Sequence, residues 1–409
     1  MNFENRFTGL LILMSLSFIF CACTNDELPV VEYLNISTDK KSAEPSLHLS
    51  EKGVIYLSWI ESDSLSSDLK FTKFEEDSWL ESSVIASGSN WFINWADFPA
   101  LTTFGDNLAA HYLEKSADGT YTYDVKLIIS NDDGKTWQKA FTPHTDNTNS
   151  EHGFVSNVAL NETNIFNVWL DGRQYAYAEQ DSTILKEMTL RGATINASSE
   201  SLEEYLLDAR VCDCCQTDTA MTNDGPIVVY RDRSDNEIRD IYYTRLISNE
   251  WTEPKSVFSD NWEIAGCPVN GPAIATLDNS VAVAWFTMAD ELSKVKIAFS
   301  KNNGATFENP IQTDFINPLG RMDVELIDAN TALVCWMDQI GEDTVIQLQK
   351  IGVDGSKSAA FTLSKSSVSR SSGFPRIVIK NNYVYATWTD VNDQSSKIKT
   401  ARVLLNNIK

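Results

Sequence analysis

A unit of similar length recurs along the chain, and every copy closes on an aromatic residue. Each copy combines a short apolar strand, a turn and a second strand of alternating polarity, as in residues 46–59 (SLHLSEKGVIYLSW). Successive closing aromatics lie 51 to 61 residues apart, which is room for four short strands and their turns. No long helical periodicity interrupts the pattern. The units are residues 46–59, 99–112, 157–169, 217–230, 272–285, 323–336 and 375–388, and they close on Trp59, Tyr112, Trp169, Tyr230, Trp285, Trp336 and Trp388.

This repeat predicts an all-β fold in which a single β-propeller occupies residues 30–409. Seven units favour seven blades, and six blades are the alternative if the first and last units share one. The last unit ends at residues 397–405 and lacks an outer strand, whereas residues 30–36 (VVEYLNI) read as a strand outside any unit. We therefore predict that this N-terminal strand pairs with residues 397–405 and closes the last blade.

A short motif between two predicted strands points the same way. Residues 130–137 (SNDDGKTW) spell S-x-D-x-G-x-T-W, and residues 300–307 (SKNNGATF) are a degraded copy. Asp132 can accept hydrogen bonds from amides of its own turn, and Gly134 supplies the positive φ that such a turn needs. The motif resembles the Asp box of the sialidase-like, BNR-repeat β-propellers. The resemblance implies the propeller fold and an exo-α-sialidase-like glycoside hydrolase that binds or cleaves an acidic-sugar glycan.

The likeness to sialidases is incomplete where catalysis is concerned. Sialidases begin with a Phe/Tyr-Arg-Ile-Pro segment that carries one of three carboxylate-binding arginines, but residues 43–46 here are AEPS. Their Tyr–Glu nucleophile pair and acid/base Asp fall on no matching motif of this chain. A second hypothesis is therefore a non-catalytic propeller that binds a glycan or a protein.

Candidate site residues come from their place in the repeat. Residues just before the innermost strand of each blade gather at the mouth of a propeller channel, and polar or charged side chains recur there in the second to seventh units. Arginine is favoured because it binds a carboxylate with two hydrogen bonds. The alternative is a channel whose polar groups bind only water or one another. The candidate catalytic residues are Asp97, Asp218 and Asp323, and the candidate substrate-binding residues are Arg173, Arg231, Arg321, Arg376, His152, Asn270 and Trp95.

The cysteines form a second cluster of interest. Cys212, Cys214 and Cys215 are closely spaced, and Cys267 stands at the corresponding place before the next innermost strand. In an exported protein such a group predicts disulfides, above all a bridge between Cys215 and Cys267. Adjacent cysteines do not easily serve two bridges, so a soft copper(I) or zinc ion held with His152 is the alternative. Cys335 lies alone in an apolar strand and is predicted to be a buried small hydrophobe.

The N-terminus predicts export. An apolar run at residues 10–20 follows Arg6, and residues 20–23 (FCAC) resemble a bacterial lipobox. We predict a lipoprotein signal peptide at residues 1–22, lipidation of Cys23 and a tether at residues 23–29; a plain signal peptide is the alternative. The acidic residues 24–27 (TNDE) resemble a signal for the cell surface. The predicted location is the outer membrane, reached only through the lipid anchor and exposed to the outside.

Charge narrows the range of partners. The chain carries a formal net charge of −24, which repels nucleic acid and anionic membranes alike. An anionic ligand would need a local cationic pocket. The sequence therefore predicts no nucleic-acid partner. The other expectations are a glycan or small-molecule ligand, no cofactor and a monomeric state.

Overall fold

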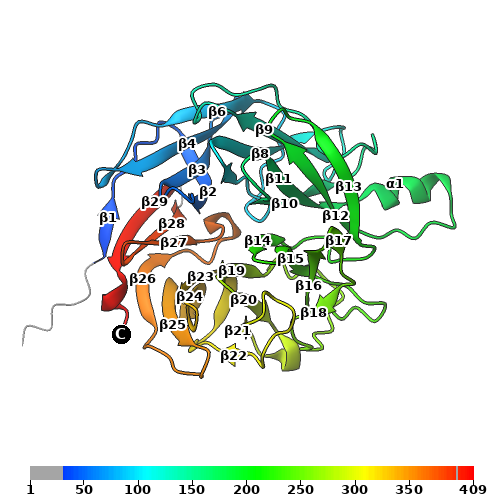
Figure 1. Ribbon diagram of the computed structural model, residues 1–409. Helices are drawn as coiled ribbons and strands as arrows, with labels where there is room; N and C mark the ends of the chain where they lie inside the picture. Colours follow the sequence, from blue (N-terminus) through cyan, green and yellow to red (C-terminus); the bar gives the residue numbers. More distant parts are fainter. Residues whose placement is uncertain (1–30, 393–394) are drawn as a thin grey trace, which may run out of the picture.

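The computed structural model describes residues 31–392 and 395–409, and over these residues the strands form seven antiparallel sheets. Figure 1 shows the sheets arranged as blades around a central axis. The prediction of a seven-bladed propeller is confirmed, and the six-bladed alternative is wrong. The predicted signal peptide, the tether and the lipidation site Cys23 lie outside the described residues. Within the described residues, no helix has the length and apolar character that a membrane crossing requires.

The blades share one plan, in which strands follow one another from the axis outward. The innermost strands are β2 (Lys41–Leu49), β7 (Leu101–Phe104), β10 (His152–Ala159), β14 (Asp218–Thr222), β19 (Ala273–Leu277), β23 (Pro318–Asp328) and β27 (Arg376–Lys380). The second strands are β3 (Ile55–Ser62), β8 (Asn107–Lys115), β11 (Asn164–Asp171), β15 (Gly225–Arg231), β20 (Ser280–Thr287), β24 (Thr331–Ile340) and β28 (Tyr383–Asn392).

The outer half of each blade is less regular. In the second blade an isolated bridge between Leu127 and Phe141 stands in place of a fourth strand. The third strands are β4 (Ser67–Glu75), β9 (Tyr123–Ser130), β12 (Thr189–Asn196), β16 (Ile241–Ile247), β21 (Lys294–Ser300), β25 (Asp343–Gly352) and β29 (Ser395–Leu404). The outer strands are β1 (Glu32–Leu34), β5 (Ser78–Trp79), β6 (Ser83–Gly88), β13 (Ser201–Asp208), β17 (Glu250–Trp251), β18 (Lys255–Ser256), β22 (Ile311–Gln312) and β26 (Phe361–Ser366).

Helix is scarce in the described residues. The α-helix α1 (Arg173–Gln180) lies in the connection between β11 and β12, and it projects from the ring (Figure 1). Three short 3₁₀ turns complete the secondary structure of the described part: η1 (Ala289–Glu291), η2 (Arg370–Ser372) and η3 (Leu405–Asn407).

The second strands form the packed core between neighbouring blades. All eight residues of β20 are buried, as expected for a strand that packs on both faces. The closing aromatics lie on these strands; Trp59, Trp169 and Trp336 are 0% exposed. Replacing such a side chain with alanine typically costs about 3–5 kcal/mol of stability. The regular spacing of these aromatics in the sequence therefore reports the spacing of the blades.

The N-terminal strand closes the ring as predicted. β1 pairs with β29 in antiparallel register, with Glu32 opposite Arg402 and Leu34 opposite Thr400. Figure 1 shows β1, the first described strand, beside β29 in this last blade. The Thr400 hydroxyl donates to the Leu34 carbonyl over 2.8 Å, and the Arg402 guanidinium Nε lies 2.7 Å from a Glu32 carboxylate oxygen. The ring is thus held by backbone pairing, a side-chain bond and an ion pair.

Both copies of the Asp-box motif adopt the same turn. In the first, Asp132 accepts from the Thr136 amide at 2.8 Å, and the Ser130 hydroxyl accepts from the Gly134 amide at 2.9 Å. Gly134 has φ of 83°, and the equivalent Gly304 of the degraded copy has φ of 77°. A β-carbon on Gly134 would lie 2.3 Å from the Phe71 ring of the first blade, so the motif also sets how closely neighbouring blades approach.

Candidate functional site

The central channel contains a cavity of about 780 Å³, and the innermost strands of all seven blades line it. Four of the predicted site residues line this cavity: Asp97, Asp218, Asp323 and Arg376. Glu325 lines it as well, two residues after Asp323 on the same face of β23. These four predicted residues thus lie together along the channel, and Glu325 lies with them.

One end of the channel is covered by the connection between the first and second blades. Its Trp95 stacks on Phe374 with 5.8 Å between ring centroids, and the Arg321 guanidinium lies 4.8 Å from the Trp95 ring. The Gln216 amide donates to the carbonyl of Ala96. Since these partners come from the fourth, sixth and seventh blades, this connection spans the axis. We call residues 94–98 the plug loop. Trp95, predicted to bind substrate, packs in the plug loop and does not line the cavity.

The cavity meets solvent at the end opposite the plug loop. Exposed residues at the far ends of the innermost strands line it there, among them Glu51, Asn161 and Glu162. A ligand would therefore enter past this rim and advance toward the plug loop.

The three predicted catalytic aspartates join neighbouring blades. Asp97 accepts from the Phe154 amide at 2.7 Å, Asp218 from the Ile274 amide at 3.0 Å, and Asp323 from the Ile377 amide at 2.8 Å. In each case the acceptor belongs to one blade and the amide to the next. These carboxyl groups therefore hold the ring together around the channel, whatever else they do.

Burial raises the pKa values of two carboxyl groups that line the cavity. It raises the pKa of Asp218 to about 6 and, with help from nearby Asp323, that of Glu325 to about 8. Glu325 makes no hydrogen bond to the described part of the chain, so its carboxyl group is available to a ligand. Arg376 lies 3.3 Å from Asp323, and the neighbouring carboxylates keep its own pKa raised. The cavity thus holds carboxyl groups in different protonation states beside one cation.

Two other predicted arginines bind backbone carbonyls away from the cavity. The Arg231 guanidinium donates to the carbonyls of Asn270 at 2.8 Å and Phe286 at 2.8 Å. The Arg321 guanidinium donates to the Ser369 carbonyl at 3.0 Å and the Ser372 hydroxyl at 2.7 Å.

The Asn270 side chain belongs to the same connecting network. Its Oδ1 accepts from the Arg321 amide at 2.7 Å, which ties the fifth blade to the sixth. Arg231, Arg321 and Asn270 were predicted to bind substrate, but none of them lines the cavity. Their buried polar atoms serve the connections between blades.

His152 and Arg173 lie in a separate buried network. His152 stacks on His144 with 3.7 Å between ring centroids, and Asp146 Oδ1 lies 2.8 Å from His144 Nδ1. Arg173 donates to Asp171 over 2.8 and 2.7 Å. Several of these atoms are near enough to share a metal ion. Because the two imidazole planes are nearly parallel, at 11°, their ring-nitrogen lone pairs do not converge on one point. Neither His152 nor Arg173 lines the channel cavity, so the prediction that they bind substrate there is wrong.

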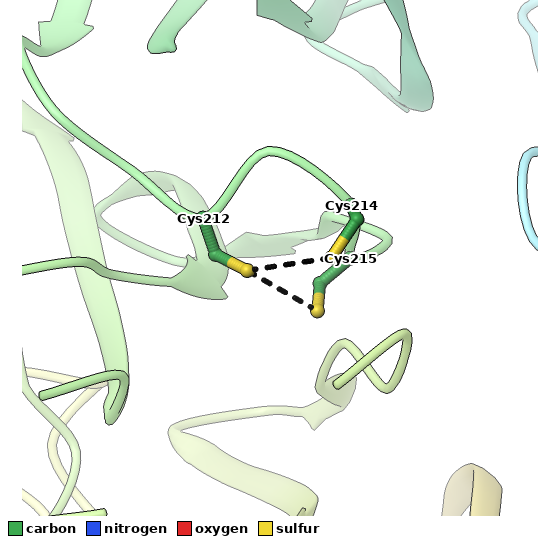
Figure 2. A group of neighbouring side chains, drawn as sticks. All are labelled: Cys212, Cys214 and Cys215. Carbon is green, nitrogen blue, oxygen red and sulfur yellow. Dashed lines mark hydrogen bonds between the residues drawn. The ribbon is translucent and has the colours of Figure 1, made fainter. Parts of the chain in front are cut away.

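The cysteines form a thiol cluster where the chain enters the fourth blade. Cys212 Sγ lies 3.7 Å from Cys214 Sγ and 3.6 Å from Cys215 Sγ, and Figure 2 shows the three sulfurs side by side. Cys267 joins Cys214 and Asp213 in a second group of neighbouring ligand atoms. All five cysteines among the described residues are free thiols, so the predicted Cys215–Cys267 bridge is not formed. Cys335 is fully buried, as predicted.

Comparison with known proteins supports the fold alone. No protein-family model matches the chain, and no curated protein matches its sequence. A structure of a protein of unknown function from Dyadobacter fermentans is similar over 91% of this chain and 98% of that one, at 13% identity and a TM-score of 0.50. The phage phi92 endosialidase is similar over 92% of this chain and 69% of its own, at 10% identity and a TM-score of 0.51. A triple mutant of AofleA from Arthrobotrys oligospora is similar over 82% and 90%, at 10% identity and a TM-score of 0.50.

Proposed function

We propose that the protein binds a carbohydrate in the channel cavity and hydrolyses a glycosidic bond there. The observation that carries this proposal is the unbonded carboxyl group of Glu325, which shares a cavity of about 780 Å³ with Asp218 and Arg376. Cavities of this size commonly hold small ligands. Carboxyl groups whose pKa values are pushed apart by burial are typical of an acid and its base. The likeness in fold to a phage endosialidase is consistent with this class.

The protonation states of the carboxyl groups suggest which one acts as the acid and which as the opposing carboxylate. Glu325, with a pKa of about 8, is mostly protonated at neutral pH and can donate a proton to the glycosidic oxygen. Asp218, with a pKa of about 6, is mostly ionised and can act as the opposing carboxylate. The Arg376 guanidinium offers hydrogen bonds that orient sugar hydroxyls. Each role follows from protonation state and place in the cavity.

A neutral sugar suits this cavity better than the acidic sugar expected from the sequence. Arg231 and Arg321 are occupied by backbone carbonyls, and Arg173 by Asp171. Arg376 already faces Asp323, and no other lysine or arginine among the described residues lines the cavity, so a carboxylate would find no unpaired cation there. Acidic sugars remain the alternative, and the test below includes them.

The test is a panel of fluorogenic glycosides, neutral and sialylated, with Glu325→Gln and Asp218→Asn as variants. Loss of a general acid lowers the rate by about 10²–10⁴-fold, and we expect this of Glu325→Gln. The control is Glu308→Gln, an exposed carboxyl outside the channel. If no glycoside is turned over and Glu325→Gln still weakens sugar binding, the chain is a binding propeller. Activity that persists in both variants refutes the assignment.

We also propose that Cys23 carries a lipid and that the propeller is displayed at the outer membrane as a monomer. The support is the lipobox-like sequence at residues 20–23 and the acidic residues after it. Cys23→Ser should move the protein from the membrane fraction to the soluble fraction and abolish acyl labelling. Unchanged membrane retention would refute the anchor.

A further inference from the structure

The thiol cluster lies apart from the channel cavity and has no part in the chemistry proposed above. We propose that Cys212, Cys214 and Cys215 bind one thiophilic metal ion, zinc(II) or copper(I), with Cys267 as the fourth ligand. The first three ligands come from one loop, and the fourth comes from the connection between the fourth and fifth blades. This inference is independent of the proposed hydrolase activity.

The separations between sulfurs fit a metal centre. Zinc–thiolate bonds of about 2.3 Å place the ligands of a tetrahedral site about 3.8 Å apart. The observed 3.7 Å and 3.6 Å from Cys212 Sγ to Cys214 and Cys215 are close to that edge. A disulfide needs sulfurs about 2.05 Å apart. The spacing therefore favours a shared ion between the three thiols over a bridge between any two.

The spacing of the cysteines in the sequence also favours a shared metal ion over a disulfide. Cys214 and Cys215 are adjacent, yet both sulfurs lie beside Cys212 (Figure 2). Two adjacent cysteines that reach one point can act together as ligands, whereas they cannot both form ordinary bridges with Cys212. Cys212 and Cys215 are 0% and 1% exposed, so the ion would sit largely out of water.

A cation, the Arg239 guanidinium, lies beside the thiol cluster. Arg239 Nη1 donates to Cys212 Sγ at 3.2 Å, and Arg239 Nη2 donates to Glu237 at 2.8 Å. Hydrogen bonds to metal-bound sulfur from outside the ligand set orient the ligand and offset its charge. Four thiolates leave a net charge of −2 on zinc(II) and −3 on copper(I), which the guanidinium offsets in part.

Cys267, the proposed fourth ligand, lies in a different loop from the other three cysteines. Ligand atoms of Cys267, Cys214 and Asp213 lie within 4.8 Å of one another, and Cys267 is exposed. A small movement of this exposed loop would bring its thiolate to the ion. His152, considered from the sequence as a ligand, belongs to the network with His144 and Asp146 and is not among the ligands.

The test starts from the mature protein, purified anaerobically with reductant and stripped with a chelator. Zinc(II) and copper(I) are added singly, each against a chromophoric chelator, and cobalt(II) reports the geometry. We expect one ion per chain and a cobalt spectrum with thiolate charge-transfer and tetrahedral bands. The ion that is held against the larger chelator excess is the preferred one. If neither ion reaches one equivalent, the proposal is overturned.

Matched variants locate the site. Cys215→Ala and Cys335→Ala each remove one buried thiol, but only the first belongs to the cluster. We expect Cys215→Ala to weaken binding at least tenfold and Cys335→Ala to leave it unchanged. Cys214→Ala repeats the test at a half-buried position in case Cys215→Ala misfolds, which circular dichroism detects. Equal binding by all three variants, or cluster thiols already paired as disulfides in protein isolated without reductant, refutes the site.

Discussion

The carboxyl group of Glu325 should make the fold less stable as the pH rises. Burial raises its pKa to about 8, from an ordinary value of 4.5. The folded protein therefore holds this proton over a pH range in which the unfolded chain has lost it. Stability falls as the pH rises through that window, because unfolding then releases a proton. Glu325→Gln removes the titration, so its stabilising effect should grow between pH 5.5 and pH 8.5.

The size of the effect follows from the same window. One pKa unit corresponds to about 1.4 kcal/mol, so the full shift amounts to about 5 kcal/mol, of which about 3 kcal/mol falls between pH 5.5 and pH 8.5. The side chain is only partly buried and faces a cavity that is open to solvent at one end, where charges are screened. We therefore expect Glu325→Gln to gain about 1–2 kcal/mol relative to the natural chain on going from pH 5.5 to pH 8.5.

The assay is urea unfolding followed by tryptophan fluorescence at the two pH values. Glu308→Gln is the control, since it removes an exposed carboxyl from the outside of the propeller. Other channel carboxyls titrate in the same range, but they are present in all three proteins, so only their coupling to Glu325 contributes to the difference. Equal changes in Glu325→Gln and Glu308→Gln between the two pH values would refute the raised pKa.

Two further predictions concern the packing between blades. Gly134→Ala should destabilise by about 2–4 kcal/mol, because its β-carbon would meet Phe71 at 2.3 Å and its φ is positive. Gly355→Ala, with a similar φ of 84° and open space around it, should cost only about 1 kcal/mol; equal urea midpoints for the two would refute the packing argument. Arg321→Met should cost about 2–4 kcal/mol by leaving buried acceptors unpaired, whereas exposed Arg370→Ala should change stability by less than about 0.5 kcal/mol. A midpoint for Arg321→Met as high as that of Arg370→Ala would contradict this role.

The repeat made it possible to predict the seven-bladed fold from the sequence. A residue such as Trp169 closes its unit because the second strand of a blade is packed on both faces, and this local requirement recurs at regular spacing. Asp132 and Gly134 specify their turn within a few residues. The closing strand was predictable because its partner visibly lacked a neighbour.

The sequence predicted only some of the residues that line the channel cavity, and the reason is physical. Position in the repeat placed Asp218, Asp323 and Arg376 at the channel, since it depends on the local strand. Arg321 was misassigned because its partners lie 48 and 51 residues away, and no local pattern encodes them. Glu325 was missed although the alternation of β23 places it on the same face as Asp323. Following the alternation one step further would have found it.

Closure of the ring by β1 also constrains when the protein can finish folding. Glu32 and Arg402 are separated by 370 positions, so the first described strand has no partner until almost the whole chain has been made. Joining ends so far apart costs on the order of 5 kcal/mol of chain entropy, which the preceding blades must already offset by holding the ends near each other. Folding rates fall as contacts become less local. During synthesis the incomplete propeller therefore presents an unpaired strand at each end, and the two strands protect one another only when the last blade is complete.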